Sequence, residues 1–401
     1  MAITDKEQGV WELDQVYNKI NQGSIWAYNA ADPGNLYCWG NNYQGVVGAF
    51  PGSAANYSSP TQVGSDTNWK EYEGSCSQSH ALKTDGTWWS WGDGLWGRLA
   101  QNSNTNYSSP KQVGTLTTWR SLGTGAQGAM GIIIRNDNTL WSWGYDQYGQ
   151  LGQNQSSPNK ISSPTQVGTD TTWSDETCNA GSHILAIKTN GTLWAWGMRA
   201  SGVLGNNQNT SPNPNGLSSP TQIGTDTNWT KACSGGNVSM MIKNDNTLWV
   251  WGNNAKGCLG LNAPQTSHRS SPTQLPGTWA DCAYIGTAVH GLKTDGTLWS
   301  WGAQDAGMLG LNQTATPSDD ARSSPCQVGT DTTWNDLESG GQMGIVGKTD
   351  GSWWVWGYTE YGKLGLNYVA DYYYVSSPTQ LPGSWNRLNH RPNGCSGITT
   401  G

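Results

Sequence analysis

The chain repeats one pattern of apolar and polar positions along most of its length. In the clearest copy, apolar residues at 184–187 lead into an Asn-Gly dipeptide at 190–191, and a Leu-Trp-Ala-Trp-Gly segment follows at 193–197. Asn-Gly accepts the positive φ angles of a two-residue hairpin turn, and residues two apart on a strand lie on the same face of a sheet. The pattern therefore predicts a β-hairpin whose second strand carries Trp194 and Trp196 on one apolar face.

A single hairpin of this kind is marginal in water because nothing covers its apolar face. The chain supplies neighbours, since the Trp-Gly dipeptide recurs every 50–55 residues, at Trp39, Trp91, Trp143, Trp196, Trp251, Trp301 and Trp356. Each unit continues with a Gly-x-Leu-Gly element or a variant of it, a loop of variable length, a Ser-Ser-Pro segment and one isolated tryptophan. We call these last residues the lone tryptophans: Trp69, Trp119, Trp173, Trp229, Trp279, Trp334 and Trp385. Seven such units predict an all-β, seven-bladed β-propeller with four-stranded blades over residues 25–401.

Radial closure requires one blade shared between the two ends of the chain. The segment 394–401 resembles the strand that precedes the hairpin turn in other units, and residues 25–28 have a similar character. We therefore expect the C-terminal strand to pair with N-terminal strands, and the order of strands in the shared blade stays open. Length differences between units concentrate in the loop after Gly-x-Leu-Gly, so these loops should project from one face of the array.

Residues 1–24 do not follow the repeat. Val10, Leu13, Tyr17 and Ile20 fall at the spacing of an amphipathic helix, and Gly23 suits a C-terminal stop. The pattern predicts a short helix near residues 10–22, within an N-terminal segment 1–24 that precedes the propeller. Such a helix either covers the rim of the propeller or docks onto another subunit.

Composition and charge exclude several classes of function. The net charge of −7 opposes contact with phosphate backbones and anionic lipid, so no nucleic-acid partner is expected. No stretch reaches the ~18 apolar residues of a membrane span, and the charged N-terminus lacks the apolar run of a secretory signal. Eight scattered cysteines without a Cys-x-x-Cys motif favour reduced, buried thiols.

Catalysis usually requires a few residues that depart from a repeat at one place, and no such motif is evident. His-Glu-x-x-His and Gly-x-Ser-x-Gly are absent, and the stretch 344–349 is too short for a phosphate loop. Most Asp residues fall in turns, and His80, His183 and His290 are interpreted as structural imidazoles at strand starts. The sequence therefore predicts no catalytic residue, no cofactor and no metal site, and hence no enzyme.

Two further sets recur with the repeat. Basic residues stand just before the hairpin turns at Lys83, Arg135, Lys188, Lys243, Lys293 and Lys348. Most of them have Asp two residues later, and its negative charge should cancel most of their positive electrostatic field. We therefore expect them to be solvated residues at strand ends. A glutamine stands two residues after each Ser-Ser-Pro proline, at Gln62, Gln112, Gln166, Gln222, Gln274, Gln327 and Gln380. We expect these to be buried amides that bond the backbone of a neighbouring blade.

The combination of His-x-x-Ala-Ile/Leu, Asp/Asn-Gly, Leu-Trp-x-Trp-Gly and Gly-x-Leu-Gly resembles the regulator of chromosome condensation repeat family, whose fold is a seven-bladed propeller. The resemblance covers about residues 25–401. It implies regulators such as guanine-nucleotide exchange factors or enzyme inhibitors. Exchange factors of this family work through one face and an inserted wedge, and this chain has no insertion long enough to match the wedge. The segment 9–18, with 23–26 after it, is similar to the opening segment of virion structural proteins of tailed bacteriophages.

Together these resemblances give a first hypothesis of a non-enzymatic bacteriophage virion protein, made in the host cytoplasm, that acts as a rigid binding scaffold in a tail appendage, a fibre or a head decoration. Expected partners are other virion proteins, a second copy of the chain, and a host-surface protein or glycan. The alternatives are a soluble regulator, either an exchange factor or an enzyme inhibitor, and a carbohydrate-binding lectin.

The candidate interaction residues come from the last and first variable loops and from the N-terminal helix. Exposed Tyr-rich segments favour recognition, because tyrosine gives large contact area with few rotamers to fix. For the loops, contact between the first and last blades is an equal alternative. The residues are Tyr368, Tyr372, Tyr373, Tyr374, Phe50, Trp11, Leu13, Tyr17 and Ile20.

Overall fold

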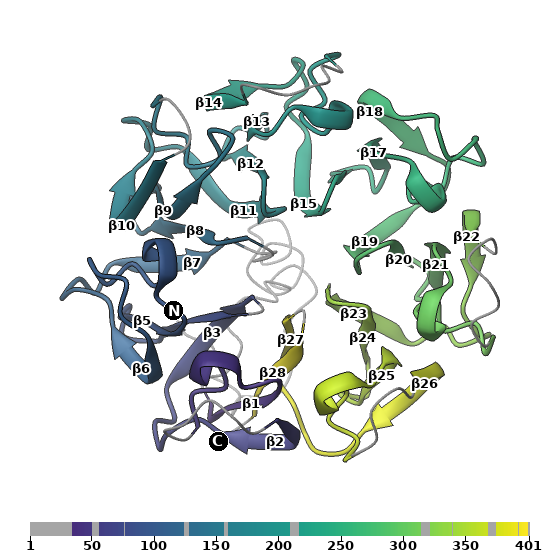
Figure 1. The fold of residues 1–401 in the computed structure, drawn as a ribbon. Coiled ribbons are helices and arrows are strands. Elements are labelled where there is room, and N and C mark those ends of the chain that lie inside the picture. Colours follow the sequence, from purple (N-terminus) through teal and green to yellow (C-terminus); the bar gives the residue numbers. More distant parts are fainter. Residues whose placement is uncertain are drawn as a thin grey trace, which may run out of the picture.

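The computed structural model describes residues 34–49, 56–75, 77–123, 128–155, 159–208, 216–313, 321–338, 340–367, 374–391 and 393–399. Within these residues, seven four-stranded antiparallel sheets stand radially around a central axis (Figure 1). The predicted seven-bladed propeller with four-stranded blades is confirmed. The helix predicted near residues 10–22 and the domain boundary at residue 24 lie outside the described residues.

The blades follow one another in chain order, and we number them 1 to 7 and their strands from the axis outwards. Blade 1 contains β27 (Arg387–Arg391), β28 (Gly394–Ile398), β1 (Leu36–Gly40) and β2 (Tyr57–Gln62). Blades 2 to 4 contain β3 (Trp69–Gly74), β4 (Gln78–Lys83), β5 (Trp88–Gly92) and β6 (Tyr107–Gln112); β7 (Trp119–Leu122), β8 (Met130–Arg135), β9 (Leu140–Asp146) and β10 (Asn159–Gln166); and β11 (Trp173–Asn179), β12 (His183–Lys188), β13 (Leu193–Gly197) and β14 (Leu217–Gln222).

Blades 5 to 7 repeat the arrangement. They contain β15 (Trp229–Gly235), β16 (Val238–Lys243), β17 (Leu248–Gly252) and β18 (Arg269–Leu275); β19 (Trp279–Tyr284), β20 (Ala288–Lys293), β21 (Leu298–Gly302) and β22 (Arg322–Gln327); and β23 (Trp334–Glu338), β24 (Met343–Lys348), β25 (Trp353–Tyr358) and β26 (Tyr374–Leu381).

Because consecutive strands are antiparallel, connections alternate between the two faces of the disc. The turn face carries the hairpin turns between second and third strands. The opposite face, the loop face, carries the variable loops and short 3-10 helices: η1 (Tyr43–Gly45), η2 (Leu95–Gly97), η3 (Ala200–Gly202), η4 (Ala255–Gly257), η5 (Asp305–Gly307) and η6 (Glu360–Gly362). Among the described residues no helix has the length and apolar character needed to cross a bilayer.

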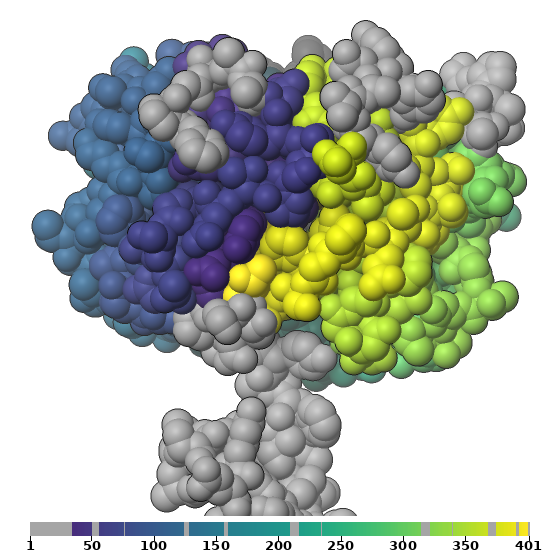
Figure 2. Space-filling model, turned by 90° about the horizontal axis from the view of Figure 1, so that it is seen from below, coloured from purple at the N-terminus to yellow at the C-terminus, as the bar shows by residue number. Residues whose placement is uncertain are grey.

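Blade 1 joins the two ends of the chain. Its inner strands β27 and β28 are C-terminal, and its outer strands β1 and β2 are N-terminal. Strand β28 pairs with β1 from Leu36 opposite Ile398 to Gly40 opposite Gly394. Figure 2 shows these first and last described segments in contact, in purple and yellow. The expected pairing of the two ends is confirmed, and the order left open is settled, with the C-terminal strands innermost.

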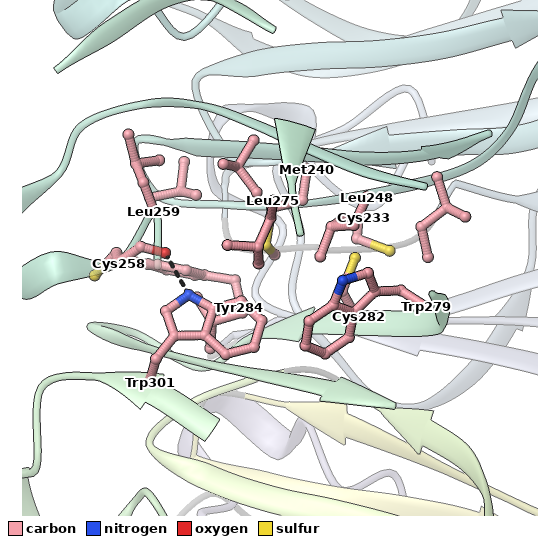
Figure 3. Close-up of a cluster of buried hydrophobic side chains, with 14 residues drawn as sticks. Cys233, Met240, Leu248, Cys258, Leu259, Leu275, Trp279, Cys282, Tyr284 and Trp301 are labelled. Atoms are coloured by element: carbon pink, nitrogen blue, oxygen red, sulfur yellow. Dashed lines mark hydrogen bonds between the residues drawn. The ribbon is translucent and has the colours of Figure 1, made fainter. Parts of the chain in front are cut away.

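The apolar core lies between the blades. Each blade presents its lone tryptophan and its Trp-Gly tryptophan to the preceding blade. The side chains that it presents to the following blade are mostly smaller apolar residues, with Trp88 and Trp353 as exceptions. Between blades 5 and 6, Met240 and Leu248 pack against Trp279 and Trp301, and all four side chains are inaccessible to solvent (Figure 3). A neighbouring blade thus covers the apolar face that one hairpin would leave exposed.

A hydrogen bond repeated at all seven blade interfaces closes the ring. The indole Nε1 of each Trp-Gly tryptophan donates to a backbone carbonyl of the Gly-x-Leu-Gly element in the preceding blade. The pairs are Trp39–Lys363, Trp91–Val46, Trp143–Arg98, Trp196–Gln150, Trp251–Val203, Trp301–Cys258 and Trp356–Met308, at 2.8–3.0 Å. The last residue of the element has a left-handed backbone and is Gly in six units and Ala100 in the seventh. A Cβ on Gly48 would lie 2.4 Å from the indole nitrogen of Trp91, and its φ is +75°.

Candidate functional site

The basic residues before the hairpin turns are buried at Lys83 and Lys243 and half-buried at the other four positions, so the prediction of solvated strand ends is wrong. Lys243 is only 8% exposed, and its ammonium lies 4.6 and 4.3 Å from the ring centroids of Trp229 and Trp249. It also pairs with Asp226, at 2.7 Å. The same ion pair recurs as Lys83–Asp66, Lys188–Asp170 and Lys348–Asp331. Sequence reasoning chose the wrong carboxylate, because Asp245, two residues after Lys243, accepts from the backbone N–H and hydroxyl of Thr247 instead.

These lysines contact two indole rings, and four of them also pair with a carboxylate, so the same substitution should have unequal effects in two blades. Lys293 lies over Trp279 and Trp299, but no carboxylate among the described residues forms an ion pair with it. Lys243→Met should therefore cost about 1–2 kcal/mol, and Lys293→Met about half as much. The melting temperatures of both variants at low and high salt test this. Equal losses that do not change with salt would show that the ion pair adds nothing.

The inner strands carry charged residues that sequence reasoning missed. At one equivalent position, the side chains lie between the inner strands of neighbouring blades, next to the axis. Their identities depart from sevenfold symmetry: Glu71, Ser121, Glu176, Lys231, Asp281, Asp336 and Arg387. Two positions further on, Glu73 and Glu338 add carboxylates on the same side of their strands.

The charged groups of this ring bond across blade boundaries. Lys231 Nζ lies 2.5 Å from Asp281 Oδ2, and Glu71 Oε1 accepts the backbone N–H of Leu122 at 3.0 Å. Burial raises the pKa of the Glu71 carboxyl, and the positive charges of Arg387 and Lys70 and the Leu122 N–H oppose this shift only in part. Burial likewise raises the pKa of Glu176. The ring is therefore a set of interblade contacts in which negative charge exceeds positive charge.

The three histidines are buried. His183 Nε2 lies 2.9 Å from the Ser239 hydroxyl, and His290 Nε2 donates to the carbonyl of Met308 at 2.9 Å. His80 packs against Trp88 and Trp143, and burial lowers its pKa to about 3. Each imidazole thus occupies a packed blade interface, which agrees with the structural interpretation. Among the described residues, no group of His, Cys, Asp or Glu has the arrangement of a metal site.

The glutamines after Ser-Ser-Pro do not form the predicted set of buried amides. Gln112 and Gln166 are half-buried, and the other five are exposed. Each lies on the outer strand opposite the first aromatic residue of the Trp-x-Trp pair, as Gln222 lies opposite Trp194 and Gln380 opposite Trp354. Each is thus the cross-strand neighbour of a half-exposed aromatic residue of its own blade, a tryptophan in six blades and Tyr37 in blade 1.

Exposed apolar side chains gather on one sector of the loop face. Among the described residues, the large hydrophobic side chains that are at least 36% exposed are Tyr43, Leu95, Trp96, Leu116 and Tyr374. Four of them belong to the neighbouring blades 7, 1 and 2, in η1, in η2 and at the loop-face end of β26. We call Tyr43, Leu95, Trp96 and Tyr374 the apolar sector. Leu116 lies in the connection from β6 to β7, on the turn face.

Trp96 is the most distinctive member of the apolar sector. Its backbone is left-handed, with a φ of +61°, a conformation that costs a bulky residue on the order of 1–3 kcal/mol. Its ring stacks on Tyr145 of blade 3 with centroids 4.8 Å apart, and the Arg98 guanidinium lies 5.2 Å from its centroid. An ion pair of 3.3 Å with Asp93 holds Arg98 in place. These contacts present the indole at the surface in a fixed orientation.

Of the candidate interaction residues, Tyr374 lies in the described part of the chain. It is 36% exposed and pairs across the sheet with Tyr358. Its role in binding stays a prediction. The other candidates lie outside the described residues: Tyr368, Tyr372, Tyr373, Phe50, Trp11, Leu13, Tyr17 and Ile20.

Comparison with known proteins identifies the repeat. The Regulator of chromosome condensation (RCC1) repeat family matches residues 137–186 and 190–242. The chain is 26% identical over 252 residues to the RCC1 domain-containing protein RUG3, mitochondrial, of Arabidopsis thaliana, a match that covers 56% of this chain and 55% of the relative. It is 24% identical to the human E3 ubiquitin-protein ligase HERC2, over 59% of this chain and 5% of that protein.

A solved structure agrees with this identification at the level of the fold. Yeast RCC1 (Prp20), in its complex with Kap60, superposes with a TM-score of 0.79 at 18% identity, over 95% of this chain and 92% of that chain. The curated relatives are longer than the matched region, since the chain spans about half of one and a small part of the other. The repeat match and the blade architecture show together that this chain is a seven-bladed β-propeller built from RCC1 repeats.

Proposed function

We propose that this chain is a non-enzymatic, protein-binding regulator that engages its partner through the apolar sector of the loop face. The observation that carries the proposal is the grouping of Tyr43, Leu95, Trp96 and Tyr374 on three adjacent blades. Scattered apolar side chains are normal on a protein surface, whereas an exposed group of this kind is typical of interaction sites.

The composition of the sector favours a protein partner. Trp and Tyr are among the residues that dominate binding energy at protein interfaces, and Trp96, Tyr43 and Tyr374 are the exposed aromatic residues of the sector. Leu95 adds an aliphatic side chain that is 47% exposed, which suits an apolar protein surface better than the hydroxyl-rich surface of a glycan. A lectin remains the second choice for this reason.

The relatives do not select the partner. One solved relative, Prp20p of Saccharomyces cerevisiae, binds Gsp1p and histones. Another relative, HERC2, is an E3 ubiquitin-protein ligase. The names of these relatives point to different functions, so a proposal for this chain has to rest on its own site. The virion hypothesis depends on residues 9–26, which lie outside the described residues, and it stays a prediction that mass spectrometry of purified particles would test.

Trp96→Gly should strongly weaken partner binding without harming the fold. Glycine accepts a φ of +61°, so the variant loses the indole while relieving backbone strain. We expect the melting temperature to stay within a few degrees of wild type. Retention of the partner from a lysate of the encoding organism, quantified by mass spectrometry, should fall at least about 30-fold, as expected for a dominant contact.

Two controls make this experiment specific. Leu116→Ser removes a similarly exposed side chain, 44% accessible, from the turn face and should leave binding unchanged. Ser201→Gly alters the equivalent left-handed position in η3, outside the apolar sector, and should also bind normally. The proposal fails if Trp96→Gly retains the same proteins as wild type, or if Leu116→Ser loses them too.

A further inference from the structure

Two cysteine side chains meet at the interface between blades 5 and 6. Cys233 lies on the inner strand β15 and Cys282 on the inner strand β19, and Figure 3 shows their sulfur atoms next to each other within the apolar cluster. A hydrogen bond joins the two thiols. Cys233 is 8% exposed and Cys282 is 4% exposed, and both are free thiols. The pair is therefore a packed dithiol that spans two blades.

The spacing of neighbouring inner strands suits a disulfide at this place. Two residues further along the same two strands, Gly235 meets Tyr284, and a Cβ on Gly235 would lie 2.9 Å from the Cβ of Tyr284. Between blades 3 and 4, the positions equivalent to Cys233 and Cys282 hold Gly123 and Thr177. A Cβ on Gly123 would lie 2.9 Å from Thr177 Oγ1. Such strands bring facing Cβ atoms to about the 3.5–4.5 Å separation that a disulfide requires.

The other six interfaces, all within the described part of the chain, do not carry two cysteines at this position. Strand register gives the equivalent pairs: Glu73 with Leu122, Gly123 with Thr177, Cys178 with Ala232, Ala283 with Leu337, Glu338 with Leu388, and Asn389 with Tyr72. The interface between blades 4 and 5 thus holds a single buried thiol, that of Cys178, in the same setting. It provides a natural control within the same molecule.

We propose that Cys233 and Cys282 are a redox modification site and form a reversible disulfide when the protein meets a hydroperoxide. One sulfur, as a thiolate, attacks hydrogen peroxide, so that an S–O bond forms, the O–O bond breaks and one water leaves after protonation. The other sulfur then attacks the sulfenic sulfur, and an S–S bond forms as the S–O bond breaks and a second water leaves. Two thiols and one peroxide thus give one disulfide and two waters.

Burial sets the class of oxidant and the pace of the reaction. A small neutral peroxide can reach these sulfur atoms, whereas a bulky disulfide such as oxidised glutathione cannot approach thiols that are so little exposed. The hydrogen bond from Cys282 and burial raise the pKa of the Cys233 thiol, so this thiol reacts more slowly than an exposed one. Once formed, the bond closes a loop of about 50 residues and opposes separation of the two blades.

Peptide mapping of the intact chain after peroxide treatment tests the site. The folded protein is treated with hydrogen peroxide, its remaining thiols are alkylated, and the digest is analysed by mass spectrometry. We expect a crosslinked peptide that joins Cys233 to Cys282, and a melting temperature raised by about 5 °C. Dithiothreitol should reverse both changes, which separates the disulfide from methionine sulfoxide. Oxidised glutathione should give at least about tenfold less crosslink.

The preceding interface supplies the matched variants. Cys282→Ala introduces the residue that blade 5 carries at the equivalent position, Ala232, so it should fold normally, form no crosslink and show no peroxide-dependent rise in melting temperature. In wild type Cys178 should stay a thiol. Ala232→Cys places a thiol opposite Cys178 and should produce a second crosslink.

The proposed site does not depend on the partner of the apolar sector, so a failure of either proposal leaves the other standing. A reversible crosslink between Cys233 and Cys282 that Cys282→Ala abolishes supports the site. The proposal is overturned if peroxide leaves both thiols alkylated by the blocking reagent, if it converts them to sulfinic acids without a crosslink, or if the crosslink forms only in denatured protein.

Discussion

Replacing Trp301 by alanine should cost about 3–5 kcal/mol of stability, the largest effect expected of any single substitution discussed for this chain. The indole is inaccessible to solvent and packs against Met240 and Leu248 of the preceding blade. Its Nε1 also donates to the carbonyl of Cys258 at 2.8 Å, so the variant leaves a cavity and an unsatisfied buried acceptor. Because the defect lies between blades 5 and 6, it weakens the ring rather than one sheet.

Two matched variants separate the causes of this loss. Trp299→Ala, two residues earlier on β21, removes a half-exposed indole and should cost clearly less. Trp301→Phe keeps most of the apolar volume but loses the hydrogen bond, so it should cost about 1–2 kcal/mol. Thermal unfolding followed by far-ultraviolet circular dichroism gives all three values. Equal losses for Trp299→Ala and Trp301→Ala would contradict packing between blades as the source of stability.

The fold could be predicted because the same sequence pattern recurs seven times along the chain. A single Leu-Trp-x-Trp-Gly segment is ambiguous, but its return with Asn-Gly or Asp-Gly turns and Gly-x-Leu-Gly fixes both the strand count and the direction of packing. The apolar face formed by Trp194 and Trp196 is confirmed, because the lone Trp173 contacts both rings. The order of strands in blade 1 could not be predicted, because either end of the chain could supply the inner edge.

The partners of polar side chains were harder to predict, because they depend on register and depth. Lys243 was matched with Asp245 by sequence proximity, but the hairpin turn directs that carboxylate to Thr247, and the true partner Asp226 precedes the lysine by 17 residues. The glutamines were expected inside because they recur. They lie instead on the outer strands, where Gln222, for example, is the cross-strand partner of Trp194 and is exposed.

The charged ring at the axis could have been predicted from a sequence pattern. Two residues after the lone tryptophan, a charged residue stands in six of the seven units, for example Lys231, Asp281 and Asp336. Blade 4 departs from the pattern, because the shift in strand register extends from Trp173 to Thr177. As a result Glu176, and not Asp175, occupies the equivalent position. The apolar sector had no such signal, since the exposure of Trp96 follows from a left-handed backbone that several unrelated residue types share.

Removing residues 385–401 should abolish cooperative unfolding of the propeller. The truncation deletes β27 and β28, so β1 keeps only β2 as a partner and Trp39 and Leu36 lose their cover. Blades 7 and 2 then face a gap where Arg387 and Leu388 stood, and an open ring exposes unpaired strand edges that favour aggregation. We expect a broad, low-temperature transition and self-association in place of a single sharp melt.

A protease site inserted between η4 and β18, in the described connection at 265–267, provides the control for this truncation. Cutting there breaks the chain but deletes no strand, so both pieces should stay together and melt as one. A synthetic peptide of residues 385–401 should restore the truncated chain, because it can pair with β1 through the register from Leu36–Ile398 to Gly40–Gly394. If the truncated chain melted as sharply and at the same temperature as the full chain, each blade would have to be stable alone. The sevenfold contacts between indoles and preceding blades would then be a consequence of the fold and not its cause.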